Sequence, residues 1–285
     1  MGKSAVAVEV ARRLDAEIVS VDSMQIYRDV DAGTDKPTPA MLAAVAHHLV
    51  GVFPPTHEVT VAEYQRLARA AVEDITARGR SPLLVGGSGL YFRAVVDDLH
   101  FPPRSEGRRA ALEAEAARAG PAVLHTRLSE LDPAAAARIE PTNTRRVVRA
   151  LEVIDATGER FSQGDTWARY DSIYDLRVAG LTRPRAELYE RVAMRVERML
   201  AEGLVAEAHA LARDGLSRTA RQALGYRQVL EAGTSTSKDD IRDAIVGATK
   251  RYVRRQESWF RADPRVTWFD ASAPDVVDRL VDHLG

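Results

Sequence analysis

An α/β fold built on a parallel sheet is the fold class that the sequence predicts, and three observations predict it. Two short apolar runs, residues 17–21 and 81–85, have the length of buried strands. Helical patterns lie on both sides of each run. The second run leads through Gly86-Gly87-Ser88 into another helical pattern, which repeats the order of strand, turn and helix. This order is typical of parallel strands covered by helices on both faces.

The helices of the first hundred residues follow from apolar spacing and capping residues. Apolar positions at helical spacing predict a helix over residues 3–14, directly ahead of the first strand. Thr38-Pro39 has the form of an N-cap and a first helical residue. Thr60 caps a further helix that we expect to end at Gly79. The sequence thus places helices before and between the two strands.

A helical insertion is expected between residues 101 and 167. Strand patterns vanish there, and helix formers dominate between Pro121, Pro133 and Pro141. A strand at residues 177–181 and two long helices, 185–202 and 239–261, then return the chain to the sheet. The predicted domains are therefore a core of residues 1–100 and 168–285 and an insertion of residues 101–167.

Composition narrows the functional classes. The chain has 285 residues, no cysteine and a formal net charge of −1. The lack of cysteine excludes disulfides and thiolate metal sites, and no apolar run approaches the roughly 20 residues of a membrane span. We expect a cytoplasmic protein that does not bind a membrane. A polyanionic partner would have to be held by local basic stripes, because the global charge is close to zero.

The opening residues Gly2, Lys3 and Ser4 match the second half of a phosphate-binding loop. In such a loop the helix N-terminus holds phosphate oxygens, the lysine supplies charge, and the serine hydroxyl can bind Mg²⁺. Asp22 follows the next strand, at the sheet edge where ligands of parallel sheets collect. It is either a functional carboxylate or an ordinary turn and cap residue.

Six strings, which together cover nearly the whole chain, occur in the order found in one enzyme family. They are VDSMQIYRDVDAGTDKP, HHL, LLVGGSGLY, RRVVRALEV, QALGYRQ and RRQESWFR. The chain resembles the tRNA dimethylallyltransferases, also called tRNA isopentenyltransferases. The resemblance implies a P-loop NTPase-like sheet with an inserted all-helical tRNA-binding domain. It also implies transfer of a dimethylallyl group from dimethylallyl diphosphate to N6 of adenosine 37, 3′ of the tRNA anticodon, with Mg²⁺ as the metal.

The reaction needs a base and a site for the leaving group. The lone pair of adenine N6 is delocalised into the ring, so a carboxylate that accepts its proton is a suitable general base, and Asp22 is the candidate. Charge that develops on the diphosphate would be stabilised by the loop and the metal. The expected diphosphate-binding residues are Gly2, Lys3, Ser4, Arg221 and Gln222, and Ser4 is the expected metal ligand.

Contacts to the tRNA are expected from the loop after the first strand and from arginines. Gln25 has the amide that can pair with an adenine edge, and Ser88 either contacts tRNA or caps the next helix. Arg145 stands where relatives commonly have glutamine. The expected tRNA-binding residues are Asp22, Ser23, Met24, Gln25, Ser88, Arg109, Arg145, Arg146, Arg149 and Arg227.

Two further clusters have more ordinary explanations. A basic helix face made of Lys250, Arg251, Arg254 and Arg255 is either a second stripe for the tRNA backbone or a solvated surface, with Trp259 and Phe260 expected in the core. The pair His47-His48 has no third ligand in view, so we expect no histidine metal site.

The family carries an apolar strand and the first half of the phosphate loop ahead of Gly-Lys-Ser, so we expect that strand and part of the loop to be missing here. The enzymatic alternatives are a prenyltransferase that acts on free adenylate and a P-loop kinase. A tRNA-binding protein impaired in catalysis by the shortened loop is the alternative from another class. A monomer is expected.

Overall fold

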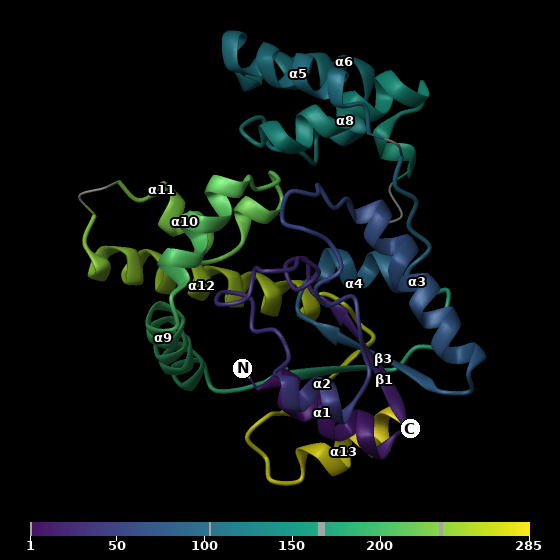
Figure 1. Ribbon diagram of the computed structural model, residues 1–285. Helices are drawn as coiled ribbons and strands as arrows, with labels where there is room; N and C mark the ends of the chain where they lie inside the picture. Colours follow the sequence, from purple (N-terminus) through teal and green to yellow (C-terminus); the bar gives the residue numbers. More distant parts are fainter. Residues whose placement is uncertain (1, 103, 165–168, 234–235) are drawn as a thin grey trace. The chain divides into compact units, whose positions relative to one another are not determined.

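The computed structural model describes residues 2–102, 104–164, 169–233 and 236–285 (Figure 1). The chain forms two compact units: Met1–Asp97 joined with Ser172–Gly285, and Asp98–Asp171. The insertion was predicted over residues 101–167, a few residues inside the second unit. Residue 167, where the predicted insertion ends, and residue 168, where the predicted core resumes, lie outside the described residues, as does Met1.

The first unit holds two parallel sheets. Strands β1 (Ala16–Val21), β2 (His47–His48) and β3 (Ser81–Gly86) form one sheet in the order β2-β1-β3. Strands β4 (Val178–Thr182) and β5 (Val266–Asp270) form the other. Parallel pairing agrees with the predicted α/β class. The strands β2 and β5 were not predicted, because β2 has only two residues and β5 follows a long helix without a turn of glycines.

Helices cover both faces of β1, every residue of which is buried. Helix α1 packs Ala7 and Ala11 against Ile18 on one face, and α3 packs Tyr64 near Val19 on the other. No described helix is long and apolar enough to cross a bilayer. The helices of this unit are α1 (Lys3–Arg13), α2 (Pro39–Ala44), α3 (Val61–Ala77), α4 (Gly89–Val96), α9 (Arg185–Ala201), α10 (Leu204–Asp214), α11 (Tyr226–Glu231), α12 (Lys238–Arg261) and α13 (Val276–Leu284).

Both predicted caps are present. The Thr38 side chain accepts a hydrogen bond from the Met41 amide at the start of α2, and the Thr60 side chain accepts one from the Glu63 amide at the start of α3. Each hydroxyl satisfies an amide that the helix itself leaves unpaired. Gly79 follows α3 with a φ of +74°, a conformation that glycine adopts without steric cost. These local signals fix where α2 and α3 begin and where α3 ends.

The described residues of the second unit form helices and the loops that connect them. Its helices are α5 (Glu106–Ala119), α6 (Pro121–Leu131), α7 (Pro133–Ala136) and α8 (Thr144–Thr157), and residues Phe161–Gly164 form a short 3-10 helix. Leu112, Leu124 and Leu151 belong to its own apolar core. Pro121 and Pro133 occupy the first positions of α6 and α7, where the missing amide hydrogen costs nothing.

A cavity of about 680 Å³ in the first unit lies along β3 and β4. Every residue of both strands lines it. Successive side chains of a strand point to opposite faces, so contact with consecutive residues means that the cavity follows the strand edges. One edge of β3 is paired with β1 and one edge of β4 with β5. The remaining edges of the two sheets therefore border the same apolar space, with Val6 and Val10 of α1 beside it.

Candidate active site

A second cavity, of about 320 Å³, lies at the carboxyl ends of β1 and β3. This is the edge of a parallel sheet where ligands bind. Its walls come from the first turn of α1, the segments after β1 and β3, the loop of residues 33–35, helices α9 and α12, and the turn before α11. All of these elements belong to the first unit. Lys3 and Ser4 line this one cavity together with Asp22, which follows them by 18 or more positions in the chain.

Asp22 has one oxygen in a turn and one oxygen free. Its Oδ1 accepts hydrogen bonds from the Met24 amide at 2.8 Å and the Gln25 amide at 3.4 Å. Its Oδ2 has no hydrogen-bond partner among the described residues. The turn therefore orients the carboxylate, while the second oxygen stays available to accept a proton from a ligand. The turn interpretation of Asp22 is thus observed, and the free oxygen leaves its functional interpretation open as a prediction.

The first turn of α1 presents a cation and a hydroxyl. Gly2, in a left-handed conformation with a φ of +81°, precedes the helix and is exposed. Burial lowers the pKa of Lys3, and Asp22 partly offsets this effect. Arg195 lowers that pKa further, whereas Asp35 raises it. The ammonium group of Lys3 therefore lies within the electrostatic field of both carboxylates at the carboxyl end of β1.

The three residues after Asp22 differ in what they offer to a ligand. Ser23 is half-buried and lines the cavity, and Met24 packs partly against the main core. Both ends of the Gln25 amide are engaged: Oε1 accepts from the Ser20 hydroxyl at 2.9 Å, and Nε2 donates to the carbonyls of Thr34 and Asp35 at 3.2 and 2.9 Å. Gln25 thus bonds to the protein with the atoms that the sequence analysis assigned to adenine.

Four arginines of α9 and α12 line the cavity, and the two from α9 were not singled out in the sequence. Arg191 and Arg195 of α9 line the cavity together with Arg251 and Arg255 of α12. Each pair is four positions apart, so each pair shares a helix face. This spacing was visible in the sequence for both pairs, but only α12 was noted as a basic face. Burial and the nearby Asp22 carboxylate raise the pKa of Tyr252, another lining residue, to about 12.

The glycine turn after β3 is shaped by close approach of α12. Gln256 Nε2 donates to the Gly87 carbonyl at 2.6 Å. A Cβ on Gly87 would meet that nitrogen at 2.1 Å, and one on Gly89 would meet the Trp259 ring at 2.3 Å. The turn therefore requires glycine for steric reasons. Trp259, expected in the core, lies on this turn and is 40% exposed. Ser88 makes no side-chain cap bond and does not line the cavity.

Three residues in the turn of residues 220–227, Arg221, Gln222 and Arg227, were expected to contact a substrate, and two of them line the cavity. Gln222 and Arg227 line the cavity, whereas Arg221 is exposed and does not. Arg227 Nε has no hydrogen-bond partner within the described chain, although it lies 3.7 Å from a carboxylate oxygen of Glu231. Its guanidinium therefore keeps donor capacity that an anionic ligand in the cavity could use.

The arginines of the second unit divide into committed and free side chains. Arg149 donates to Glu152 at 2.9 Å and to the Pro102 carbonyl at 2.7 Å, and Arg109 donates to Glu113 at 2.9 Å. Arg145 and Arg146 are exposed and form no ion pair with any described residue. Arg145 and Arg149, both expected to bind tRNA, therefore differ: the Arg149 guanidinium is engaged by described residues of the unit, and the Arg145 guanidinium is not.

Comparison with known proteins gives a consistent result. The model of the family described as IPP transferase matches residues 25–263. A protein of Salinispora tropica named tRNA dimethylallyltransferase is 53% identical over 282 residues, which cover 97% of this chain and 87% of that protein. The crystal structure of a tRNA isopentenylpyrophosphate transferase from Bacillus halodurans superposes with a TM-score of 0.71 at 38% identity, covering 99% of this chain and 91% of that one.

A more distant structure supports the fold. It is a eukaryotic dimethylallyltransferase acting on tRNA, and it superposes with a TM-score of 0.81 at 23% identity, covering 98% of this chain and 74% of that chain. At this level of identity the likeness concerns the architecture. The match to the family model spans most of the chain, and the relatives align with nearly all of it. The chain belongs to the IPP transferase family.

Proposed function

We propose that this protein transfers a dimethylallyl group from dimethylallyl diphosphate to N6 of adenosine 37, 3′ of the anticodon in tRNA. The observation that carries this proposal is the convergence of Asp22 with Lys3 and Ser4 on one cavity at the sheet edge. The similar protein of Salinispora tropica is named for the same activity. Cytoplasmic location and a monomeric state are part of the proposal.

Asp22 acts as the general base. As the adenine N6 bonds to the allylic carbon, the carbon–oxygen bond to the diphosphate breaks, and the N6 proton passes to the free Oδ2 of Asp22. The departing diphosphate gains negative charge, which Lys3 and Arg227 stabilise at the same cavity. Gln222 adds a neutral polar group beside them, and Gly2 and Arg221 remain predicted diphosphate contacts at its margin.

The residues present fit a Mg²⁺ ion. This ion prefers hard oxygen donors and usually keeps several water ligands. The Ser4 hydroxyl is such an oxygen donor in the cavity beside Lys3, so we propose that Ser4 holds the ion. When bound, the metal neutralises charge on the diphosphate.

The tRNA contacts are proposed for two sets of residues. In the first unit they are Ser23, Met24, Gln25, Ser88 and Arg227, all near the carboxyl ends of β1 and β3 or the turn before α11. In the second unit, Arg145 and Arg146 have charges free for phosphates. Arg109 and Arg149 remain proposed contacts, although both are paired within the unit.

A transfer assay tests the function. The protein is incubated with labelled dimethylallyl diphosphate and either unmodified tRNA or AMP, and we expect label in tRNA alone. Label in AMP alone would favour the adenylate prenyltransferase. Binding of tRNA without transfer would favour an RNA-binding protein, and consumption of ATP with a small acceptor would favour a kinase.

The cavity along β3 and β4 supports the expectation of a further strand. We propose that it accepts one more parallel strand, because the cavity follows the edges of β3 and β4 that are not paired with β1 and β5 and has apolar walls. The test compares this chain with a version extended by a strand and a full phosphate loop. We expect a higher melting temperature and tighter diphosphate binding in the extended version, and equal values would refute the proposal.

A further inference from the structure

We infer that Tyr226 and Glu207 are positioning residues, which hold the loop of residues 31–35 in place as one wall of the cavity beside Asp22. This segment is called the wall loop below. The inference rests on the proposed function, since it assigns a role in that transfer reaction. It concerns two side chains that do not line the cavity themselves.

The amides of the wall loop are held from α10 and α11. Glu207 Oε1 accepts from the Asp31 amide at 2.8 Å, and Oε2 accepts from the Ala32 amide at 3.3 Å. The Gly33 amide donates to the Tyr226 hydroxyl at 3.1 Å, and that hydroxyl donates to Glu207 Oε1 at 2.5 Å. Three consecutive amides therefore end on two side chains that also bond to each other.

The carbonyls of the wall loop are held from the cavity side. Gln25 Nε2 donates to the carbonyls of Thr34 and Asp35. Arg195 donates to the Gly33 carbonyl at 3.2 Å, and its guanidinium lies 3.5 Å from the Asp35 carboxylate. The loop is thus fixed on both sides. Gln25 and Arg195 line the cavity, so a shift of the loop would move groups that face the reactants.

Packing makes the attachment rigid. Tyr226 is 1% exposed, and a Cβ on Gly33 would lie 2.4 Å from its ring. No other residue type fits at position 33 without displacing the ring. Burial, followed by the bond to Glu207, raises the pKa of Tyr226, so the hydroxyl stays protonated and remains a donor at neutral pH.

The expected consequence is kinetic. Transfer requires the adenine amine, the allylic carbon and Asp22 to meet within a fraction of an ångström, and misplacement of about 1 Å can cost on the order of 100-fold in rate. Asp35 is part of the wall loop and the Gln25 side chain bonds to that loop, whereas Asp22 is held by its own turn. Loosening the loop should therefore lower kcat more than it weakens the binding of tRNA.

Tyr226→Phe is the test variant, because it removes one hydroxyl and keeps the ring against Gly33. Tyr27→Phe is the matched control: Tyr27 is also fully buried, its hydroxyl accepts from the Val59 amide at 3.4 Å, and it does not line the cavity. We expect Tyr226→Phe to lower kcat about tenfold with the KM for tRNA changed less than about twofold. Tyr27→Phe should leave both values near wild type.

Glu207 supplies the rescue test. Glu207→Ala removes every acceptor, whereas Glu207→Gln keeps one oxygen for the Asp31 amide and the Tyr226 hydroxyl. We expect the glutamine variant to recover part of the kcat that the alanine variant loses. Equal losses in the two variants at the same folded fraction would contradict the positioning role.

Hydrogen exchange separates the inference from the proposed function. In Tyr226→Phe the amides of residues 31–33 should exchange faster by on the order of tenfold, while the Val59 amide is unchanged. Unchanged exchange in the loop, or a kcat of Tyr226→Phe equal to that of Tyr27→Phe, overturns the inference. If the wild-type protein transfers nothing to tRNA, the proposed function fails, while faster exchange of the amides of residues 31–33 in Tyr226→Phe still shows that Tyr226 holds the wall loop.

Discussion

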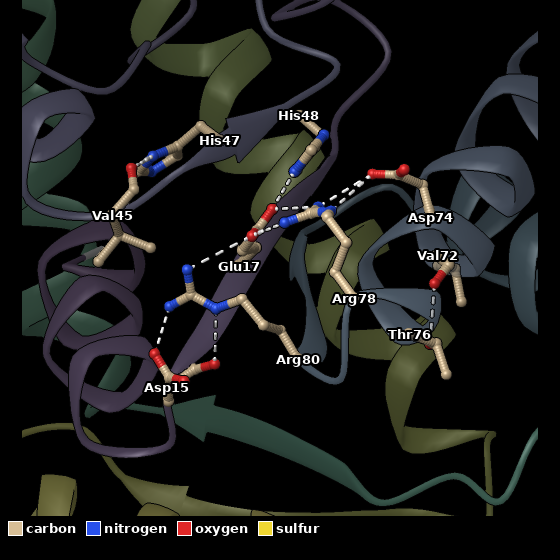
Figure 2. Close-up of polar contacts among 10 residues, drawn as sticks. All are labelled: Asp15, Glu17, Val45, His47, His48, Val72, Asp74, Thr76, Arg78 and Arg80. Atoms are coloured by element: carbon tan, nitrogen blue, oxygen red, sulfur yellow. Dashed lines mark hydrogen bonds and ion pairs between the residues drawn. The ribbon is translucent and has the colours of Figure 1, made fainter.

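Strand β1 has a carboxylate at each end, and the two lie in opposite environments. Glu17, near the amino end, has a side chain only 3% exposed, and Arg78, Arg80 and His48 surround it (Figure 2). Arg78 binds both of its oxygens, Arg80 lies 3.5 Å from one of them, and His48 Nε2 lies 2.7 Å from the other. The Arg78 hydrogen bonds lower the pKa of Glu17 to about 2 against the opposing effect of burial.

Asp22, just beyond the carboxyl end of β1, is half-buried, lines a cavity and keeps one oxygen without a partner in the described chain. The cations nearest to this end, Lys3 among them, also line the cavity and are not paired with Asp22. Both carboxylate oxygens of Glu17 are bound by protein side chains, whereas Asp22 Oδ2 is available to a ligand. Glu17 is thus committed to the fold, whereas Asp22 has the free oxygen that its proposed role as a base requires.

The largest expected effect is on catalysis, from Asp22→Asn. Asparagine keeps an oxygen for the Met24 amide, so the turn and the stability are retained, while the base is lost. We expect transfer to tRNA to fall about a thousandfold, with the melting temperature close to wild type. Single-turnover rates and thermal unfolding measure the two quantities. Near-normal turnover would remove Asp22 from the role of base.

Glu17→Gln should have the reverse effect. The change leaves Arg78 and Arg80 without their shared buried anion. We expect the free energy of unfolding in urea to fall by about 2–3 kcal/mol, less than for a wholly buried pair because both arginines are partly exposed to solvent. The transfer rate of the folded fraction should be unchanged. A loss of rate without a loss of stability would contradict the contrast between the two carboxylates.

Acid titration sharpens the contrast. The pKa of Glu17 is about 2 in the folded protein against an ordinary value of 4.5. Its contribution is therefore complete above pH 4.5 and is lost as the pH falls toward 2. We expect wild type to lose up to about 3 kcal/mol over this range from Glu17 alone. Urea unfolding at several pH values should show a flatter profile in Glu17→Gln, and parallel profiles would contradict the assignment.

The smallest expected effects come from two arginines of the second unit, one unpaired among the described residues and one bonded to a buried carboxylate. Arg145→Ala removes a free charge, so we expect weaker tRNA binding, a salt slope reduced by about one unit and unchanged stability. Arg149→Ala removes the ion-pair partner of the fully buried Glu152, so it should lower stability in addition to its effect on tRNA binding. Filter binding at several salt concentrations, together with melting curves, checks both variants. Identical behaviour of the two variants would break the distinction.

The sequence by itself determined the class of fold and the ends of several elements. Local causes suffice there: apolar spacing marks β1 and β3, and Thr38 and Thr60 cap helices through bonds to amides only three residues away. The short phosphate-loop motif and Asp22 were also visible, since both are defined by a few adjacent residues. The six ordered strings indicated the family to which the comparisons assign the chain.

Only the tertiary structure decided which charges are free and which are committed. Glu17 and Asp22 are five positions apart and equally acidic, yet their roles depend on Arg78 and His48, residues that fold back from other elements. The same holds for Gln25, whose amide is engaged by the wall loop, and for Tyr226, which meets Gly33 from 193 positions away. Such contacts join distant parts of the chain, and no local pattern encodes the distances that decide whether a side chain bonds to the protein or to a ligand.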